Sequence, residues 1–363
     1  MSVRPVVGCM SGTSLDGLDA ALVDITARGL AMTARLRRHV SRPLGSLADG
    51  LRALAAQQPR SAGEIARLVQ EFELLHLDAV RTVCADTHPG LVAVHGQTVF
   101  HAPPVSWQLL SVSRLARELG APVVYNLRAA DLATGGQGAP ITPLADYIFF
   151  QSETEARAVL NLGGFCNFTL LPRGPRGDDA GALAAIGGGD ICACNQLLDA
   201  LARELLGTPF DADGARALCG ASRPRAHAAL AARLRDQAAG GRSLGTGDEL
   251  GEWIDAWRGQ ATPEDLLRTA CNAIAAVACE RIGPVERLIV AGGGAHNGAM
   301  LAALRSRGVP VSLSDEFGVP IQAREAAAMA VLGALCQDGV PITLPQITGC
   351  AVPAPRAGCW AYP

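Results

Sequence analysis

Short apolar runs broken by glycine-rich bends occur at the start of the chain and again near its middle. Residues 6–25 are predicted to form a strand, a turn through residues 11–17 and a second strand. Residues 158–172 repeat this pattern, with Gly163 and Gly164 at the bend. Each half of the chain is therefore expected to begin with a β-hairpin.

A long amphipathic helix and then a strand that ends in glycine follow each hairpin. The strands are expected within residues 90–101 and 287–300. Thr262 and Pro263 are typical of an N-cap and a first helical position, and they mark the start of the second helix. Apolar residues recur with the helical period in both helices, namely Ile65, Leu68, Val69, Phe72, Leu75 and Val80, and Leu266, Leu267, Ala270, Ile274, Val277 and Ala278.

This alternation of strands and helices predicts the fold class. It favours mainly parallel pairing under a layer of helices, while the hairpins add antiparallel strands. The prediction is therefore α/β, with two similar lobes that each hold a mixed, mostly parallel sheet flanked by helices, and with a cleft between the lobes. The glycine-rich stretches 173–182 and 238–251 are expected to be exposed loops.

The composition narrows the class of function. The chain has 363 residues, of which 49% are hydrophobic and 18% are charged, and its net charge is −3. This is enough apolar material for two ordinary cores. Because no long basic run is present, neither nucleic acid nor an anionic membrane is expected as a partner, and a small-molecule substrate is favoured.

The cysteines and the amino terminus bear on the compartment. The sequence has neither a secretory signal nor a membrane-spanning run, so a cytoplasmic protein is expected. Eleven cysteines are scattered without a CxxC pair, which favours reduced thiols over a disulfide framework. Cys192 and Cys194 form a C-x-C pair, but neither a second pair nor a nearby histidine completes a metal site, and small buried side chains are the simpler interpretation.

The first turn carries groups that suit a phosphate. Gly12 and Gly17 can adopt positive φ and let an anion approach the backbone. Hydroxyl and carboxylate groups come from Thr13, Ser14, Asp16 and Asp19. A plain hairpin turn would also use Gly and Asp, but two hydroxyls and two acids together favour a phosphate site.

The duplicated arrangement, with a hairpin first, resembles the sugar kinase, actin and heat-shock ATPase superfamily, in which a nucleotide lies between two lobes. Across nearly the whole chain, the order of motifs is similar to that of the anhydro-N-acetylmuramic acid kinase family. MSGTSLDG and GGQGAP are its most specific parts. The segments that carry the resemblance are GCMSGTSLDGLDAALVD (8–24), VHGQTVFH (94–101), NLRAADLATGGQGAPITPL (126–144), NLGGFCNFTLL (161–171), GGDICACNQLLD (188–199), AGGGAHN (291–297), REAAAMAVLG (324–333) and LPQITG (344–349).

This resemblance implies an ATP-dependent carbohydrate kinase of peptidoglycan recycling. ATP and water would convert 1,6-anhydro-N-acetylmuramic acid to N-acetylmuramic acid 6-phosphate, opening the anhydro bridge and phosphorylating O6. Mg²⁺ is the second expected cofactor, held through water by Asp16 or Asp19. We expect an N-terminal lobe of residues 1–135, a C-terminal lobe of residues 136–344, and a tail, 345–363, that returns to the first lobe.

The resemblance also assigns the base and the nucleotide contacts. Asp190 would take the proton of the attacking water, although an Asp before an apolar run also suits a helix N-cap. Gly292, Gly293 and Gly294 would let adenosine approach the backbone, or would simply form a tight strand-to-helix turn. The remaining nucleotide contacts implied are Gly12, Thr13, Ser14, Leu15, Asp16, Gly17, Leu18, Asp19, Asn195 and Asn297.

The sugar contacts are expected in three segments. His95, Gln97 and Thr98 follow a buried strand, but a lone histidine is often structural. Arg128 and Asp131 are better placed for ligand contact, because the guanidinium of Arg128 can grip the lactyl carboxylate of a muramic sugar in a bidentate manner, unless the two residues form a surface ion pair. Glu325 could meet the sugar, or favour the dipole of the helix that it opens.

One segment departs from the family pattern. Where the family has Asp-Thr-Gly-Pro-Gly-Asn, this chain has Asp-Ile-Cys-Ala-Cys-Asn at 190–195. Side chains would then stand where glycine amides approach the nucleotide, which bears on phosphate binding and on the identity of the sugar. A kinase of another sugar and an actin-like ATPase switch without a small substrate are the alternatives. A homodimer is expected from the family.

Overall fold

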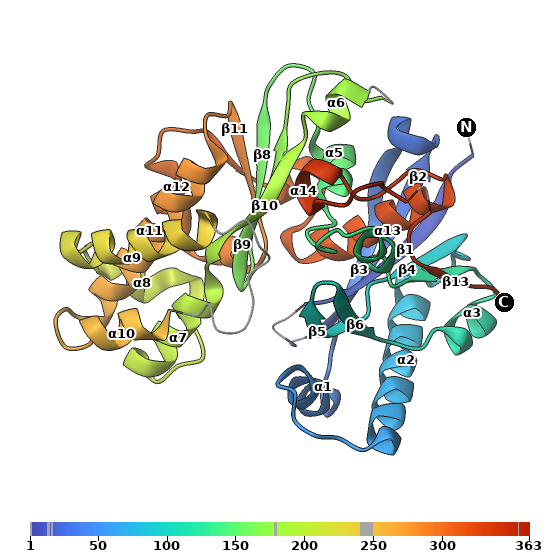
Figure 1. The fold of residues 1–363 in the computed structure, drawn as a ribbon, viewed down its shortest axis with the longest axis horizontal. Helices are drawn as coiled ribbons and strands as arrows, with labels where there is room; N and C mark the ends of the chain where they lie inside the picture. The colour runs from blue at the N-terminus through green and yellow to red at the C-terminus, as the bar shows by residue number, and fades with distance from the viewer. Residues whose placement is uncertain (1, 13–14, 16, 178–179, 240–249, 355) are drawn as a thin grey trace. The chain divides into compact units, whose positions relative to one another are not determined.

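The computed structural model describes residues 2–12, 15, 17–177, 180–239, 250–354 and 356–363. The chain divides into two compact units (Figure 1). Unit 1 comprises residues 1–151, 176–185 and 318–363, and unit 2 comprises residues 152–175 and 186–317. No helix in the described residues is both long enough and apolar enough to span a bilayer.

A six-stranded sheet forms the centre of unit 1, in the order β13-β7-β4-β1-β2-β3. β2 is antiparallel to both of its neighbours, β1 and β3, while β4 and β7 run parallel to β1, and β13 pairs antiparallel with β7 at the edge. The strands are β1 (Arg4–Ser11), β2 (Gly17–Thr26), β3 (Thr33–Pro43), β4 (Leu91–Val94), β7 (Val123–Tyr125) and β13 (Cys359–Ala361). β13 thus brings the end of the chain onto unit 1.

Helix α13 (Arg324–Gln337) covers this sheet and contacts β1, β2 and β4. The two backbones approach so closely that a Cβ on Gly8 would overlap the backbone of Ala326 and Ala330. Nearly every side chain of α13 is buried, as its run of alanines permits. The other helical segments of unit 1 are η1 (Gly29–Ala31), α1 (Leu47–Ala55), α2 (Ala62–Cys84), α3 (Ser113–Leu119), α4 (Ala129–Ala133), α5 (Pro143–Phe150), α6 (Ala180–Ala184), η5 (Ile321–Ala323) and α14 (Pro345–Thr348).

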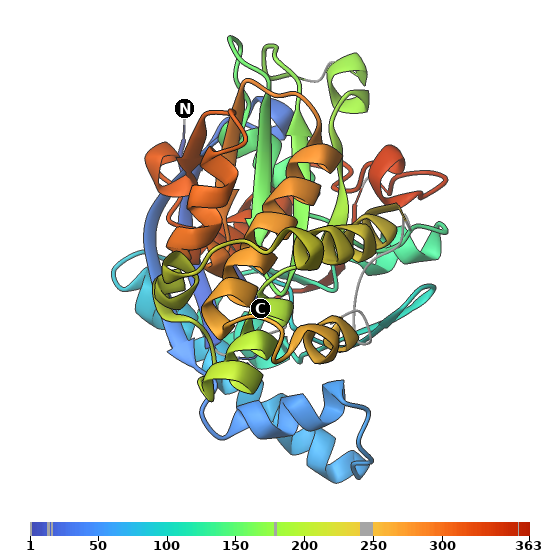
Figure 2. The same cartoon turned by 90° about the vertical axis from the view of Figure 1, so that its left-hand side faces the viewer.

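A two-stranded ribbon of β5 (Gln97–Ala102) and β6 (Val105–Leu109) follows β4 in unit 1. Its root packs on α1 and α2, because Val99 and Leu109 belong to the same apolar cluster as Leu51 and Phe72. Helices α1 and α2 lie side by side in both views (Figures 1 and 2). Ser61 and Glu64 form a reciprocal capping box at the start of α2.

A five-stranded sheet forms the centre of unit 2, in the order β10-β9-β8-β11-β12. β9 is antiparallel to both of its neighbours, β8 and β10, and β11 and β12 run parallel to β8. The strands are β8 (Arg157–Leu162), β9 (Phe165–Leu171), β10 (Gly187–Ala193), β11 (Arg287–Ala291) and β12 (Val311–Leu313). The strand order β10-β9-β8-β11-β12 and the strand directions correspond to those of β3-β2-β1-β4-β7 in unit 1. The predicted duplication is therefore confirmed.

Helix α11 (Pro263–Ile282) packs against β10 and against α9 (Pro224–Ala239). Thr262 caps it through a hydrogen bond from the Asp265 amide, and Pro263 is its first residue, as predicted. The remaining helical segments of unit 2 are α7 (Asn195–Leu206), η2 (Ala212–Gly214), α8 (Ala215–Cys219), α10 (Gly251–Trp257), η3 (Gly293–His296), α12 (Gly298–Arg305) and η4 (Ser314–Phe317).

The α/β class and the two hairpins follow the sequence prediction, but the extents of the units differ from the expected lobes 1–135 and 136–344. Residues 136–151 and 318–344 pack in unit 1, because α5 and α13 contact each other and α13 lies on β1. The stretch 173–182, expected to be a loop, includes the start of α6. Most of the second expected loop, 238–251, lies outside the described residues.

Candidate functional site

The first candidate turn joins β1 to β2. Thr13, Ser14 and Asp16 lie outside the described residues. Leu15 has φ +58° and is only 5% exposed, and its side chain belongs to the apolar cluster that contains Leu51 and Val99. The Leu15 amide donates to the Gly12 carbonyl at 3.2 Å. The turn is therefore anchored to the core of unit 1 by a buried leucine.

The first residues of β2 have little freedom to contact a ligand through their side chains. Leu18 is fully buried in the core of unit 1. A Cβ on Gly17 would come within 2.9 Å of the Arg42 carbonyl oxygen. The Asp19 carboxylate interacts with His39 Nε2 at 3.1 Å and also accepts a hydrogen bond from Ser41. Any role of Leu18 in nucleotide binding would thus fall to its backbone.

A buried hydrogen bond links this turn to the predicted sugar segment. Ser11, the last residue of β1, donates from Oγ to Gln97 Oε1 at 2.9 Å. The backbone turns sharply between β4 and β5, where Gly96 has φ +77°. Ser11 and Gln97 are 3% and 1% exposed. The two predicted segments therefore meet at the carboxyl ends of β1 and β4.

His95 lies beside Gln97 and holds Arg128. Its Nδ1 donates to the Gly96 carbonyl at 2.8 Å, which leaves Nε2 to accept from Arg128 Nε at 3.0 Å. Burial, followed by the charge of Arg128, lowers the pKa of His95 to about 3. The ring is therefore neutral at physiological pH. Arg128 also donates to the Gly138 carbonyl at 2.8 Å, so two protein contacts orient its guanidinium group.

Asp131 organises the neighbouring glycine-rich loop. One carboxylate oxygen accepts from the Gly138 amide at 2.7 Å, and the other accepts from Thr348 Oγ1 at 2.7 Å. Because Asp131 is 1% exposed, the alternative of a surface ion pair with Arg128 is wrong. A Cβ on Gly136 would overlap the Asp131 carboxylate, which explains the glycine there. The contact of Asp131 with a sugar stays a prediction.

Two further predicted sugar residues occupy ordinary positions in unit 1. Glu325 is half-buried in the first turn of α13. Its neighbour Arg324 is buried and pairs with Asp146 of α5 through Nη2, at 2.5 and 2.6 Å from the two carboxylate oxygens. Thr98 begins the ribbon, and its Oγ1 accepts from Gln108 Nε2 at 3.4 Å. The structure brings Thr98 near Gln97, and the contacts of Thr98 and Glu325 with a sugar stay predictions.

In unit 2, Asp190 lies within strand β10, opposite Asn167 of β9. A β-bulge follows it, because Cys192 is the next residue in register and Ile191 is the extra residue. Bulges often re-aim a side chain beside an active site. The N-cap of α7 is Cys194, so the alternative in which Asp190 caps this helix is wrong. Asp190 lies within β10, four residues before this N-cap.

The departure at 191–194 is accommodated inside unit 2. Ile191, Cys192, Ala193 and Cys194 are all fully buried. The Sγ atoms of Cys166 and Cys192 lie 3.9 Å apart, and all eleven cysteines are free. These residues pack in the core: Ile191, Cys192 and Ala193 end β10, and Cys194 is the N-cap of α7. Within the described residues, no group of three or more His, Cys, Asp or Glu side chains could hold a metal ion.

The glycines after β11 pack against the end of β8. Gly292 has φ +79°, and a Cβ there would lie 2.6 Å from Asn161 Oδ1. A Cβ on Gly294 would lie 2.7 Å from that of Leu162, whereas a Cβ on Gly293 would find its nearest neighbour, Asn195 Nδ2, at 3.8 Å. Gly292 and Gly294 thus have a packing role, while a Cβ at position 293 would fit without overlap.

The two predicted asparagines of unit 2 both have structural contacts. Asn195 Nδ2 donates to the Leu162 carbonyl at 3.0 Å. Asn297 caps α12 by accepting from the Met300 amide at 3.0 Å. The amide of Asn195 donates to the Gly163 carbonyl at 3.1 Å, so the start of α7 is fastened to the β8–β9 turn. Their predicted contacts with ATP remain predictions.

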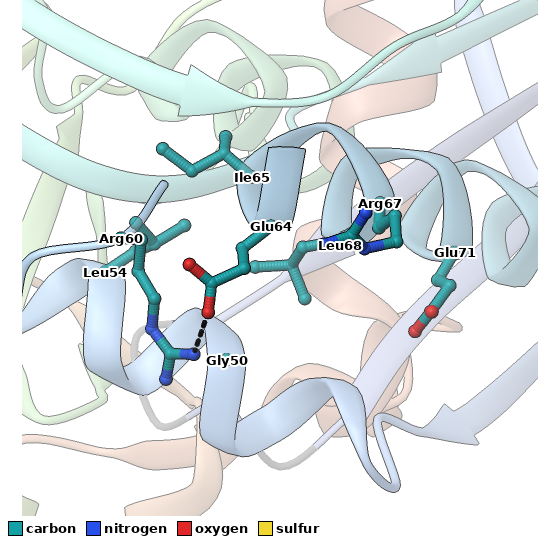
Figure 3. Close-up of a pocket in the computed structure, with 8 residues that line it drawn as sticks. All are labelled: Gly50, Leu54, Arg60, Glu64, Ile65, Arg67, Leu68 and Glu71. Carbon is teal, nitrogen blue, oxygen red and sulfur yellow. Dashed lines mark hydrogen bonds and ion pairs between the residues drawn. The ribbon is translucent and has the colours of Figure 1, made fainter. Parts of the chain in front are cut away.

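A pocket of about 210 Å³ lies between α1 and α2, apart from the predicted residues. Figure 3 shows its lining, in which Arg60 and Glu64 form an ion pair at 3.4 Å. The eight lining residues are Gly50, Leu54, Arg60, Glu64, Ile65, Arg67, Leu68 and Glu71. None of them belongs to a motif that the sequence marks for chemistry.

Hydrogen bonds therefore join residues from three segments of unit 1: Ser11, His95 with Gln97, and Arg128. Sequence reasoning missed Ser11, although a hydroxyl at the end of a strand just before a glycine turn was a usable signal. It also missed Gly138 and Thr348 as the partners of Asp131. Thr348 lies in the tail that was expected to return to the first lobe, but no local pattern marks which residue of the tail contacts Asp131.

Comparison with known proteins gives a match along nearly the full length. Residues 4–358 match the family model described as anhydro-N-acetylmuramic acid kinase. A protein of that name from Salinibacter ruber is 37% identical in an alignment of 388 positions, which covers 98% of this chain and 95% of the relative. The proteins of that name from Synechococcus sp. and Streptomyces coelicolor are each 36% identical, over 94% and 95% of this chain and 96% and 90% of theirs.

Two solved structures of other proteins align at lower sequence identity. An activator of 2-hydroxyisocaproyl-CoA dehydratase from Clostridium difficile aligns with a TM-score of 0.45 and 14% identity, over 91% of this chain and 94% of that protein. A ROK family glucokinase from Streptomyces griseus aligns with a TM-score of 0.41 and 16% identity, over 91% and 99% of the two chains.

Proposed function

Because the chain belongs to the anhydro-N-acetylmuramic acid kinase family, and is therefore a carbohydrate kinase that uses ATP, we propose how its own residues carry out the reaction. The family reaction takes 1,6-anhydro-N-acetylmuramic acid, water and ATP to N-acetylmuramic acid 6-phosphate and ADP, in peptidoglycan recycling. We propose that it takes place in the cytoplasm. A homodimer is the oligomeric state that we propose from the family.

The observation that carries this proposal is the buried hydrogen bond between Ser11 and Gln97, at 2.9 Å. Ser11 immediately precedes the turn proposed to hold the ATP phosphates, and Gln97 belongs to the segment proposed to bind the sugar. Phosphoryl transfer requires the acceptor oxygen and the γ-phosphorus to be in line and close together. A fixed link between the two segments suits that requirement.

The sugar would bind at the carboxyl ends of β1 and β4. Arg128 is proposed to pair with the lactyl carboxylate, which is the charged group of the muramic sugar. His95 is a positioning residue, since its neutral Nε2 accepts from Arg128 Nε at 3.0 Å and fixes the guanidinium plane. Asp131 is also proposed as a positioning residue, because it holds the Gly138 amide and so orders the loop whose carbonyl Arg128 contacts.

Asp190 would act as the general base. The water oxygen forms a bond to the anomeric carbon, its proton passes to the Asp190 carboxylate, and the bond from that carbon to O6 breaks. O6 then bonds to the γ-phosphorus as the bond from phosphorus to the ADP oxygen breaks. The bulge after Asp190 supports this role, because a bulge interrupts the regular pairing of two strands and can change the direction of a nearby side chain.

ATP would bind through the turn that contains Gly12 and through the glycines after β11. Leu15 and Leu18 contribute backbone only, because both side chains are buried. Gly293, whose added Cβ would have no neighbour closer than 3.8 Å, is the position most open to adenosine. The other nucleotide contacts implied by the family, among them Thr13, Ser14 and Asp16, remain part of the proposal.

Mg²⁺ is proposed as the metal that accompanies ATP. Its chemistry would be to neutralise charge on the phosphate oxygens. We propose that phosphate oxygens hold it, with Asp16 or Asp19 in contact through water. The Asp19 carboxylate already contacts His39 and Ser41, so Asp19 suits a contact through water.

ATP consumption measured with and without the anhydro sugar tests the proposal. Sugar-dependent ADP release, with the 6-phosphate as product, is the expected result. Turnover only with a different sugar would favour a kinase of that sugar. ATP hydrolysis that ignores every sugar would favour an actin-like switch, and either result would overturn the proposed substrate.

A further inference from the structure

The β5–β6 ribbon of unit 1 has an unusual distribution of side chains. Phe100 and Trp107 are opposite each other in register and are 38% and 46% exposed, and Val105 is 59% exposed. The other face carries polar residues that are half-buried, namely Thr98, His101, Ser106 and Gln108. Solubility does not explain a ribbon that shields its polar face and exposes its apolar face, so this arrangement calls for another explanation.

Ser106 lies at the centre of the polar face, and its contacts assign the protons. Its Oγ donates to the Phe100 carbonyl at 3.3 Å. A hydroxyl has one proton, so the same oxygen must accept from Gln108 Nε2 at 2.8 Å and from His101 Nδ1 at 2.9 Å. His101 therefore carries its proton on Nδ1. Its Nε2 and the Oε1 atom of Gln108 are left as acceptors.

Both of these acceptor atoms are buried, and neither has a hydrogen-bond partner among the described residues. Leaving a polar atom buried and unpaired is costly, so such atoms in a native protein call for an explanation. Two acceptors on one face match a ligand that brings hydrogen-bond donors. The apolar face of the ribbon offers no such match.

The polar face lies in the neighbourhood of the proposed sugar residues. Burial and then the charge of Arg128 lower the pKa of His101, against a smaller raising effect of a hydrogen bond from the ring to the Gln137 backbone, and His101 in turn contributes to the lowered pKa of His95. The ribbon begins at Gln97, whose side chain is tied to Ser11. His101 is thus within electrostatic reach of Arg128 and His95.

We propose that His101 Nε2 and Gln108 Oε1 accept hydrogen bonds from the sugar and help to determine its specificity. This inference rests on the proposed function. In 1,6-anhydro-N-acetylmuramic acid, O1 and O6 are tied in the bridge and O3 carries the lactyl group. The donors that remain are the C4 hydroxyl and the acetamido N–H. A buried acceptor for the C4 hydroxyl would reject sugars glycosylated at that position.

Variants of His101 separate a sugar contact from a structural one. His101→Phe removes both nitrogens, and we expect the Kd of the sugar to rise about 5-fold to 100-fold. His101→Gln places a polar atom near the position of Nε2 and should recover much of the affinity. His101→Asn replaces only the Nδ1 contact with Ser106 and should not. Recovery by Asn but not by Gln would show a structural role and overturn the inference.

Gln108→Met is the second test, and Val105→Thr on the exposed face of the ribbon is its matched control. Gln108→Met should weaken sugar binding over the same range, while the Kd of ATP and the melting temperature stay close to the wild-type values. Val105→Thr should leave all three unchanged. If both His101→Phe and Gln108→Met bind the sugar as the wild type does, this inference is overturned, while the proposed function is unaffected.

Sugar analogues identify the donor. A 4-deoxy analogue lacks the hydroxyl, and an analogue with an ester in place of the acetamide lacks the N–H. If one analogue binds the wild type more weakly, and Gln108→Met or His101→Phe adds no further loss, that donor is the partner and the inference stands. Fully additive losses with both analogues would overturn it. A wild-type protein that binds no anhydro sugar would overturn the proposed function as well.

Discussion

The sheets of the two units have the same strand order and directions, but the helices that cover them pack in different ways. In unit 1, α13 lies so close to β1 that a side chain at position 8 would overlap the helix backbone. In unit 2, α11 buries larger residues such as Leu266, Leu267 and Ile274. Duplicated topology therefore does not require a duplicated core, because strand order and the spacing between helix and sheet are set by different residues.

The units also differ in what lies at the ends of their strands. In unit 1, Ser11, Gln97, His95 and Arg128 are joined in pairs by side-chain hydrogen bonds. In unit 2, the corresponding region has a bulged strand with Asp190 and a run of glycines after β11. This difference fits the proposed roles, in which the polar side chains of unit 1 recognise the sugar and the small residues and single acid of unit 2 serve the nucleotide and the general base.

The largest effect is expected from unit 2. Asp190→Asn should lower kcat about 10²-fold to 10⁴-fold, because the amide cannot take the proton of the attacking water. Steady-state kinetics and ATP binding measured by calorimetry provide the check, with ATP affinity expected to stay near that of the wild type. Asp236→Asn, on the exposed side of α9, is the control. Normal turnover in Asp190→Asn would end its assignment as the base.

The close packing of α13 on β1 in unit 1 should give the next largest effect. Gly8→Ala should lower the free energy of unfolding by about 3 kcal/mol, because the added Cβ meets the backbone of Ala326 and Ala330, which cannot move aside freely. Urea denaturation measures the change. Gly90→Ala is the control, since a Cβ there would lie 3.5 Å from the Pro5 carbonyl oxygen, an ordinary contact. Equal stability of the two variants would contradict the close packing.

Substitutions at two adjacent glycines of unit 2 distinguish a packing role from a role in nucleotide binding. Gly292→Ala should destabilise the protein by about 2 kcal/mol, because of its φ of +79° and its close approach to Asn161 Oδ1. Gly293→Ala should leave stability within about 0.5 kcal/mol and raise the KM for ATP, if adenosine approaches there. Thermal denaturation and kinetics distinguish the two. A stable Gly292→Ala variant would remove the packing role.

A smaller, pH-dependent effect is expected from unit 1, which contains both buried histidines of the described residues, His76 and His95. Burial lowers the pKa of His76 to about 4. Below an unfolded pKa of about 6.5, the unfolded chain binds a proton that the folded one does not, so stability falls as the pH drops towards 4. His76 alone should account for about 2 kcal/mol between pH 7 and pH 5.

His76→Phe checks this assignment, because it removes the titrating group while keeping a ring against Phe72, at present 4.4 Å away between ring centres. Urea denaturation at pH 7 and pH 5 should show a smaller loss of stability in the variant than in the wild type. An identical loss in both proteins would mean that other groups cause the acid sensitivity.

Much of the fold could be predicted from local pattern. The two hairpins, α2 and α11 with its Thr262 cap follow from apolar periodicity and turn residues. The path of α13 could not be predicted, because it depends on the fit between an alanine-rich helix and Gly8, more than 300 residues apart in sequence. Strand β10 (Gly187–Ala193) could not be predicted from local pattern, because it is rich in Gly, which is depleted in strands, and its pairing with β9 decides the outcome.

The candidate site was predictable in its residue types more than in its contacts. His95, Gln97 and Arg128 were marked by motif, and they do lie together in unit 1. That Arg128 is held by a neutral histidine depends on burial, which sequence does not report. The buried acceptors on the ribbon follow from a register shift between Thr98 and Phe100, which a pattern of alternate residues cannot locate.

The position of α13 late in the chain has a consequence for biosynthesis. The strands that it covers are translated first, yet their apolar surface is left open until residues beyond 324 leave the ribosome. Nascent chains that stop earlier should therefore recruit chaperones or aggregate. Ribosome-stalled chains ending before and after this helix would show at which length the amino-terminal sheet becomes protected.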